Sequence, residues 1–219
     1  MSRRQSFHED PYAYLNVMRE AFAGHYAAGT DMWSQDDSLL EAARNASAFW
    51  QQLHRGQRPR LLDIGCGNGR VFRILQGDLG GYTGVDLCEH PEWQALAAAQ
   101  TSPAEFAAGD FAEWAAGRDG GAYDLVLDHG CLHHQHPGHQ GAHLAGMVKL
   151  LAQGGMLSLV VWAESWKPED IGEDGRFHLA FTREGIERMI AGAGLEIVQM
   201  EETRARVGTN QFHVIACKR

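Results

Sequence analysis

The segment LLDIGCGNGR, residues 61–70, constrains the fold of this 219-residue chain more than any other feature. An apolar run ends at Ile64, and Gly65, Gly67 and Gly69 follow at alternate positions. Glycine lets a backbone turn sharply and lets a ligand approach without a Cβ in the way. The residues after the third glycine read as a helix, whose first turn has free N–H groups. The segment therefore predicts a buried strand, a ligand-binding turn and a helix.

Strand-like and helix-like patterns alternate in the rest of the chain after Pro59. Strands are expected at residues 60–64, 81–86, 123–128, 156–162, 195–203 and 211–217, with helices beginning near residues 70, 91, 139 and 182. Such alternation is typical of a mainly parallel α/β sheet that is covered on both faces. The last two strands have no helix between them, which favours an antiparallel pair at one edge.

The N-terminal part reads as helical, and we expect residues 1–58 to form a lid or extension on a domain of residues 59–219. Asp10-Pro11 is a typical helix start. The apolar residues of this first helix fall at helical spacing, at Leu15, Met18, Phe22 and Tyr26. A second helix is expected from near Asp36, with an apolar face made of Leu39, Ala43, Ala46, Trp50 and Leu53.

Composition excludes several classes of partner. The net charge is −9, which argues against a nucleic-acid backbone as the main partner, because such binding relies on clustered Lys and Arg. There is no apolar run long enough for a membrane span and no apolar secretory core near the N-terminus. The four cysteines are far apart and form no CxxC pair. We therefore expect a cytoplasmic protein that acts on a small molecule, and the oligomeric state stays open.

Acidic residues at later strand ends add to the predicted ligand site. Asp86 ends the second strand about 20 residues beyond the glycine loop, where a carboxylate can accept hydrogen bonds from two ribose hydroxyls. Asp110 follows Gly109, and Asp128 ends another strand. Asp110 could equally be the N-cap of the helix that follows it. Open α/β sheets place their ligands at the carboxyl ends of the strands, where these residues lie.

These motifs resemble the class I, Rossmann-like S-adenosylmethionine-dependent methyltransferases of the small-molecule type, over residues 60–219. The resemblance implies a seven-stranded, mainly parallel sheet with an antiparallel C-terminal edge strand. It implies S-adenosyl-L-methionine as the cofactor and a small-molecule acceptor that is methylated on O, N or S. The cofactor-binding residues that it implies are Asp63, Gly65, Cys66, Gly67, Gly69, Asp86, Leu87, Asp110, Phe111 and Asp128.

Six histidines lie between His129 and His143. A histidine with a near-neutral pKa can remove a proton from an acceptor as the methyl group arrives. His133 is the preferred catalytic base and His134 the second choice; the alternative is that they cap a helix or are solvated. His139 and His143 are four residues apart, but zinc sites need three or four protein ligands, so no metal is expected.

Aromatic and basic residues outside the core motifs are candidates for contact with the substrate. Aromatic rings can shield a sulfonium cation, although ordinary helix packing explains them equally well. The segment 163–180 is expected to form a specificity loop, in which an arginine could hold an anionic group. The candidates are Tyr14, His25, Tyr26, Trp33, Trp166 and Arg176.

Three alternative functions stay open at this point. A nicotinamide-dependent oxidoreductase shares the topology, but the glycine spacing is not GxGxxG. Nothing in the sequence excludes an enzyme that uses S-adenosylmethionine for other chemistry, whereas the intact cofactor-loop signature counts against a non-catalytic binding module; the fold alone distinguishes none of these. The residues after the fourth strand, Asp128-His129-Gly130-Cys131, lack an Asn-Pro-Pro-Tyr-type motif, which counts against methylation of amides or nucleobase amines.

Overall fold

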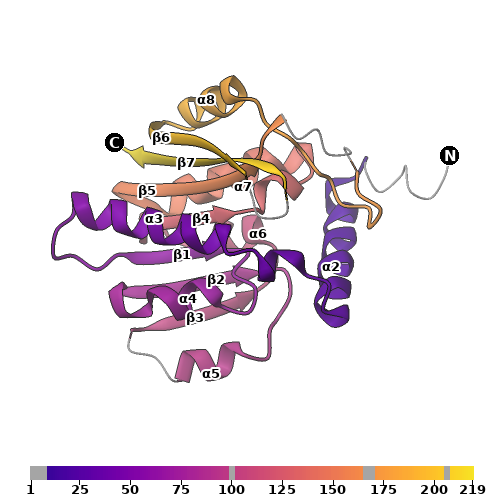
Figure 1. The fold of residues 1–219 in the computed structure, drawn as a ribbon, viewed down its shortest axis with the longest axis horizontal. Helices are drawn as coiled ribbons and strands as arrows, with labels where there is room; N and C mark the ends of the chain where they lie inside the picture. Colours follow the sequence, from indigo (N-terminus) through magenta and orange to yellow (C-terminus); the bar gives the residue numbers. More distant parts are fainter. Residues whose placement is uncertain (1–8, 99–101, 165–170, 205–207) are drawn as a thin grey trace.

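The computed structural model describes residues 9–98, 102–164, 171–204 and 208–219. These residues build one seven-stranded sheet with helices on both faces (Figure 1). The strands are β1 (Arg60–Ile64), β2 (Gly81–Asp86), β3 (Ala104–Ala108), β4 (Tyr123–His129), β5 (Leu151–Trp162), β6 (Leu195–Arg204) and β7 (Asn210–Lys218). Their order in the sheet is β3-β2-β1-β4-β5-β7-β6.

The first five strands are parallel to one another, and β7 is antiparallel to both β5 and β6. The predicted fold class is therefore confirmed. β7 inserts between β5 and β6, so that β6 is the edge strand of the C-terminal pair. The sequence patterns missed β3, because its residues AEFAA include three alanines, which have low β propensity.

Helices cover the two faces of the sheet in two groups of three. One core cluster contains residues of α3 (Ser38–Leu53), α4 (Arg70–Leu75) and α5 (Trp93–Ala98), and the other contains residues of α6 (Phe111–Ala116), α7 (Pro137–Leu150) and α8 (Arg183–Gly192). Leu53 was expected on the buried face of α3 but is exposed, because the helix continues for almost one turn beyond Trp50, its last buried residue. Short 3-10 turns lie at Met32–Gln35 (η1), Gln76–Asp78 (η2) and Leu132–His134 (η3).

The N-terminal helix α2 (Pro11–Ala28) stands across the carboxyl ends of the parallel strands, on the right in Figure 1. Its predicted start is confirmed, since Asp10 accepts a hydrogen bond from the backbone N–H of Tyr12. None of the helices within the described residues is both long enough and apolar enough to cross a membrane.

A single hydroxyl group joins α2 to two other segments. Tyr14 Oη donates to the carbonyl oxygen of His134 at 2.7 Å and accepts from the backbone N–H of Phe177 at 2.7 Å. Burial raises the pKa of Tyr14, so the hydroxyl stays protonated and able to donate. The helix, the η3 turn and the segment after residue 171 are therefore held together at one buried point.

We expect Tyr14→Phe to loosen this junction, because it leaves a buried donor and a buried acceptor without a partner, which costs about 1–3 kcal/mol. Chemical denaturation measures the loss of stability, and hydrogen exchange shows whether α2 and residues 171–182 open together. Tyr12→Phe is the matched control, because Tyr12 is 69% exposed. Equal stability and exchange in the two variants would contradict the proposed role of the Tyr14 hydroxyl.

Candidate active site

A cavity of about 260 Å³ lies at the carboxyl edge of the sheet, between the strand ends and the N-terminal segments. One side is formed by the loops after β1, β2 and β3, which contribute Gly65, Asp86 and Asp110. The other side is formed by β5 and the start of β7, which contribute Trp162 and Gln211. The cavity therefore joins the predicted cofactor loops to a second, aromatic and polar wall.

The glycine loop has the backbone that its sequence predicts. Gly65, Gly67 and Gly69 have φ values of +72°, +52° and +81°, a region that other residues rarely adopt. Gly65 lines the cavity, and a Cβ on it would overlap the sulfur of Cys131. Gly67 and Gly69 belong to the loop but do not line the cavity. Cys66 does not line the cavity either, and its side chain is buried.

Asp86 ties the glycine loop to the end of β2. Its Oδ2 accepts from the backbone N–H of Gly67 and its Oδ1 from the N–H of Cys88, both at 2.9 Å. Burial raises the pKa of Asp86 overall, and the two backbone donors offset only part of the rise. Asp86 and Leu87 both line the cavity, as predicted for residues that hold a cofactor.

Asp110 caps the helix that follows it and also lies on the cavity wall. Its Oδ1 accepts from the backbone N–H of Glu113 at 2.9 Å and caps α6, and the residue also lines the cavity. Phe111, the first residue of α6, lies on the same wall. A cap that uses one carboxylate oxygen leaves the other available to a ligand.

Asp63 and Asp128 lie beneath the cavity wall rather than on it. Asp63 accepts from Tyr82 Oη at 2.7 Å, and burial raises its pKa to about 7, with Asp86 and Asp128 adding to the rise. Asp128 accepts from the backbone N–H of Cys131 at 2.9 Å and bonds to His143 Nε2 at 2.7 Å. Asp63 therefore ties β1 to β2, and Asp128 supports the turn that follows β4.

The two predicted catalytic histidines line the cavity and are buried. The ring of His133 stacks on Trp162, with centroids 3.9 Å apart and an angle of 18° between the planes. His134 Nδ1 lies 2.8 Å from the carbonyl oxygen of Phe177, so this nitrogen carries the proton. Burial lowers the pKa of His134 to about 3 and the pKa of His133 well below its usual value. Both rings are therefore neutral at physiological pH.

A hydrogen-bonded row runs from the cavity across three neighbouring strands. His129 Nε2 lies 2.9 Å from Ser158 Oγ, which lies 3.0 Å from His213 Nε2. His129 lines the cavity, and burial lowers its pKa to about 3. The sequence analysis did not single out Ser158 or His213, because no motif links residues whose register across β4, β5 and β7 is set by the sheet.

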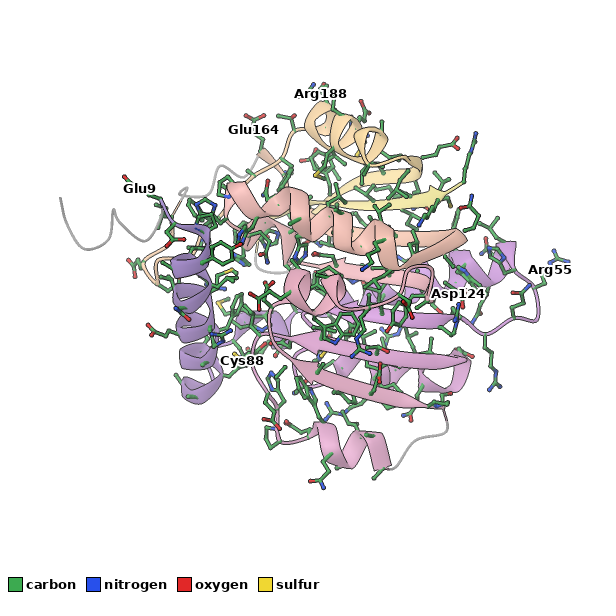
Figure 2. The ribbon with its side chains drawn as sticks, turned by 180° about the vertical axis from the view of Figure 1, so that it is seen from behind. Glu9, Arg55, Cys88, Asp124, Glu164 and Arg188 are labelled. Carbon is green, nitrogen blue, oxygen red and sulfur yellow. The ribbon has the colours of Figure 1, made fainter. Side chains whose placement is uncertain are left out.

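Two of the predicted substrate residues lie on the cavity wall, on the side of the N-terminal segments. Trp33 Nε1 donates to Tyr26 Oη at 3.3 Å, and both side chains line the cavity. Tyr26 sits over the glycine loop, since a Cβ on Gly67 would lie 3.5 Å from its hydroxyl oxygen. Cys88 lies beside α2 at the same end of the sheet (Figure 2).

Three other predicted substrate residues hold segments together and do not line the cavity. Besides Tyr14, these are His25 and Arg176, which bond to the same Asp174 oxygen at 3.1 and 2.7 Å. Burial would raise the pKa of Asp174, but the hydrogen bonds and charge of Arg176 lower it overall. The Arg176 guanidinium also lies 4.4 Å from the ring centroid of Phe22. Trp166 lies outside the described residues.

The two histidines considered for a metal site have different partners. His143 pairs with Asp128, whereas the ring of His139 contacts Tyr12 with centroids 5.2 Å apart. Within the described parts of the chain, no three His, Cys, Asp or Glu side chains are grouped as metal ligands.

Several residues of the cavity wall carry no sequence signal that would have found them. Asp36 was used only to mark a helix start, and Trp162 only as the end of a strand. The wall residues that sequence reasoning did not select include Phe22, Met32, Asp36, Leu39, His129, Gln135, His143, Trp162, Thr209 and Gln211. They come from segments that only the folded sheet brings together.

We expect Asp63→Asn to change how stability depends on pH. The pKa of Asp63 is about 7 in the folded protein and 3.8 in a model peptide, so only the folded protein holds this proton between these values. Its contribution to stability is fully present below about pH 4 and is lost as the pH rises to about 7, by up to about 1.4 kcal/mol per unit. Urea denaturation at several pH values should therefore show that the free energy of unfolding of Asp63→Asn, relative to that of the wild type, increases as the pH rises. A difference in stability between the variant and the wild type that stays constant with pH would contradict the prediction that the buried Asp63 carboxyl is protonated in the folded protein.

Comparison with known proteins agrees with this geometry. Residues 61–155 match a family model described as a methyltransferase domain. A malonyl-[acyl-carrier protein] O-methyltransferase of Paenibacillus sp. (strain JDR-2) is 28% identical over 139 residues, which are 60% of this chain and 49% of the relative. The chain thus spans about half the length of this curated relative.

Solved structures resemble the whole described chain. The structure of Burkholderia thailandensis 1,6-didemethyltoxoflavin-N1-methyltransferase, with 1,6-didemethyltoxoflavin and S-adenosylhomocysteine bound, has a TM-score of 0.80 at 29% identity, covering 95% of this chain and 90% of that chain. Magnesium protoporphyrin IX methyltransferase from Synechocystis PCC 6803, with bound S-adenosylmethionine, shares the fold at a TM-score of 0.61 and 19% identity, covering 82% and 79%. Residues 61–155 therefore match a methyltransferase domain, within a chain that has the class I, Rossmann-like methyltransferase fold, whose cosubstrate is S-adenosyl-L-methionine.

Proposed function

We propose that this protein transfers the methyl group of S-adenosyl-L-methionine to an N, O or S nucleophile of a small, flat heterocyclic metabolite. The observation that carries the proposal is the continuous cavity. Asp86 and Gly65 lie on its cofactor side, and the stacked rings of His133 and Trp162 lie on its other side. A site that holds two reactants in one enclosed space aligns them for direct transfer and excludes water.

The residues proposed to bind the cofactor fall into three groups, one for each part of the cofactor molecule. The carboxylate of Asp86 suits the ribose hydroxyls, because its two oxygens can accept two donors. Asp110 suits the adenine amino group, with Leu87 and Phe111 packing on the ring. The loop at Gly65 suits the amino-acid end, since no Cβ limits the approach of a ligand.

Support for a flat acceptor comes from the rings around the second half of the cavity. Trp162 and His133 are stacked there, and His134 meets Trp162 edge-on with centroids 4.9 Å apart. Rings prefer offset-stacked or edge-to-face neighbours, so a planar acceptor fits among them. The similar Burkholderia thailandensis enzyme is named for N1-methylation of a didemethyltoxoflavin, which is in keeping with this acceptor class.

The chain's own residues act mainly by positioning. When bound, the cofactor supplies a methyl carbon that its sulfonium already activates. His133 and His134 are neutral, and a pKa far below 7 makes them weak bases. In this proposal they orient the acceptor through their ring faces and nitrogens. The described part of the N-terminal segment, residues 9–58, closes the site in this proposal, because Tyr26 and Trp33 lie on the cavity wall.

The cellular setting is also part of the proposal. The net charge of −9 favours a small acceptor over a nucleic acid. All four cysteines are free, in keeping with the reduced environment of the cytoplasm. We therefore propose a cytoplasmic enzyme of small-molecule metabolism.

We expect Asp86→Ala to weaken binding of S-adenosylhomocysteine by about tenfold or more, because hydrogen bonds to a charged group contribute about 1.5–3 kcal/mol. Calorimetric titration measures this effect. Asp124→Asn is the control, because Asp124 lies at the opposite end of the sheet, in an ion pair with Arg60 (Figure 2). NADH serves as a negative ligand. Wild-type protein that binds neither S-adenosylhomocysteine nor the methyl donor would overturn the proposed function.

Methyl transfer from labelled S-adenosyl-L-methionine, with 1,6-didemethyltoxoflavin as the first acceptor tried and other flat heterocycles after it, tests the reaction. We expect His133→Gln to lower kcat without changing the shape of its pH profile between about pH 6 and 8, because the ring is already neutral there. A wild-type profile that falls below pH 7 and becomes flat in His133→Gln would instead make His133 the base.

A further inference from the structure

The acceptor half of the cavity has one anionic side chain that the proposed function has not used. Asp36 lies between η1 and α3, lines the cavity, and is only 6% exposed. Thr209 and Gln211, at the start of β7, lie on the same wall. Gln211 is the register partner of Trp162 on β5, so this polar group borders the aromatic wall.

One oxygen of Asp36 is held in place by the helix that follows. Oδ1 accepts from the backbone N–H of Ser38, the first residue of α3, at 2.9 Å. The positive end of the helix dipole stabilises a carboxylate at this position. The bond to Ser38 thus fixes the direction of the side chain.

The second oxygen of Asp36 has no such partner. Among the residues that the structure describes, no donor is bonded to Oδ2, and this oxygen keeps accessible surface on a residue that lines the cavity. The nearby Arg70 does not neutralise it, because this guanidinium pairs with Asp37 at 2.8 Å and also reaches the carbonyl oxygen of Trp33. Asp36 therefore brings an uncompensated negative charge to the cavity.

A second acceptor of hydrogen bonds lies beside it. Gln211 Nε2 donates to Ser38 Oγ at 3.4 Å, which leaves the amide oxygen of Gln211 available. Asp36 is 6% exposed, so Oδ2 has little access to solvent except through the cavity, and an acceptor in such a place favours a ligand that donates to it. The molecule that fills this space must supply that donor, and a molecule that carries its own negative charge there is repelled.

We propose that Asp36 determines which acceptor binds, by accepting a hydrogen bond from an N–H or O–H of the acceptor and by excluding anionic groups. The inference rests on the proposed function, because it takes this half of the cavity as the acceptor site. It narrows the acceptor to a neutral or cationic flat heterocycle with a hydrogen-bond donor on its edge. Asp36 is thus a specificity-determining residue, and Gln211 assists it.

Asp36→Asn separates this role from the local bond to Ser38. The N-cap of α3 is Asp37, and the amide oxygen of an asparagine at position 36 can still accept from the backbone N–H of Ser38 while the charge is removed. Asp37→Asn is the matched control, because it removes the neighbouring charge, which lies outside the cavity wall and is largely exposed. Equal melting temperatures of Asp36→Asn and Asp37→Asn would show that both variants are folded.

The probes are benzimidazole, its 1-methyl derivative and its 2-carboxylate, titrated by NMR into protein saturated with S-adenosylhomocysteine. Wild type should bind benzimidazole, and Asp36→Asn should weaken this binding by about tenfold, as expected for loss of a bond to a charged group. The 1-methyl probe should bind wild type more weakly and be insensitive to the substitution. The carboxylate probe should bind better to Asp36→Asn than to wild type, and Asp37→Asn should behave as wild type with all three.

Two other outcomes would overturn the inference. Benzimidazole could bind wild type and Asp36→Asn equally, or none of the three probes could bind the loaded protein. In both cases, retained binding of S-adenosylhomocysteine would leave the cofactor half of the proposed function standing. Failure of S-adenosylhomocysteine to bind would instead mark failure of the proposed function itself.

Discussion

Three carboxylates at the ends of neighbouring parallel strands organise this molecule, because each must find a hydrogen-bond donor at the same edge of the sheet. Asp63 accepts a hydrogen bond from a tyrosine hydroxyl, and Asp86 accepts from two backbone N–H groups. Asp128 accepts from the turn that follows β4 and is also hydrogen-bonded to His143. The bond of Asp63 ties β1 to β2, whereas the bonds of Asp86 and Asp128 fix the turns that border the cavity. Burial raises the pKa of Asp63, and repulsion from Asp86 and Asp128 raises it further.

The N-terminal helix depends on this edge rather than on the sheet faces. α2 contributes a small cluster of its own, with Tyr14 and Phe177 in contact, and the ion pair of Asp174 and Arg176 joins it to the later segment through His25. The aromatic residues of α2 thus have two different roles, one structural and one at the cavity. Tyr14 ties segments together, whereas Tyr26, three turns later, faces the glycine loop.

Much of the fold was predictable, because strong local patterns coincide with the tertiary structure. β1 and β2 have the predicted bounds, and Thr182 caps α8 as its sequence indicates. β3 was missed, because alanines in a partly covered strand leave no apolar alternation to detect. The exposed Leu53 was misplaced for a related reason: helical spacing identifies a face but does not show where the sheet beneath it ends.

The sequence by itself indicated the proposed cofactor half of the cavity, because a glycine loop and acids at strand ends are local features that act through the backbone. It also determined the sheet, through the alternation of strands and helices. Only the tertiary structure decided the acceptor half. Asp36, Trp162 and Gln211 come from three distant segments, and their meeting depends on β7 inserting beside β5 and on α3 packing across the sheet. No local sequence pattern predicts that these three residues lie on one cavity wall, because long-range packing of the helices and strands places them there.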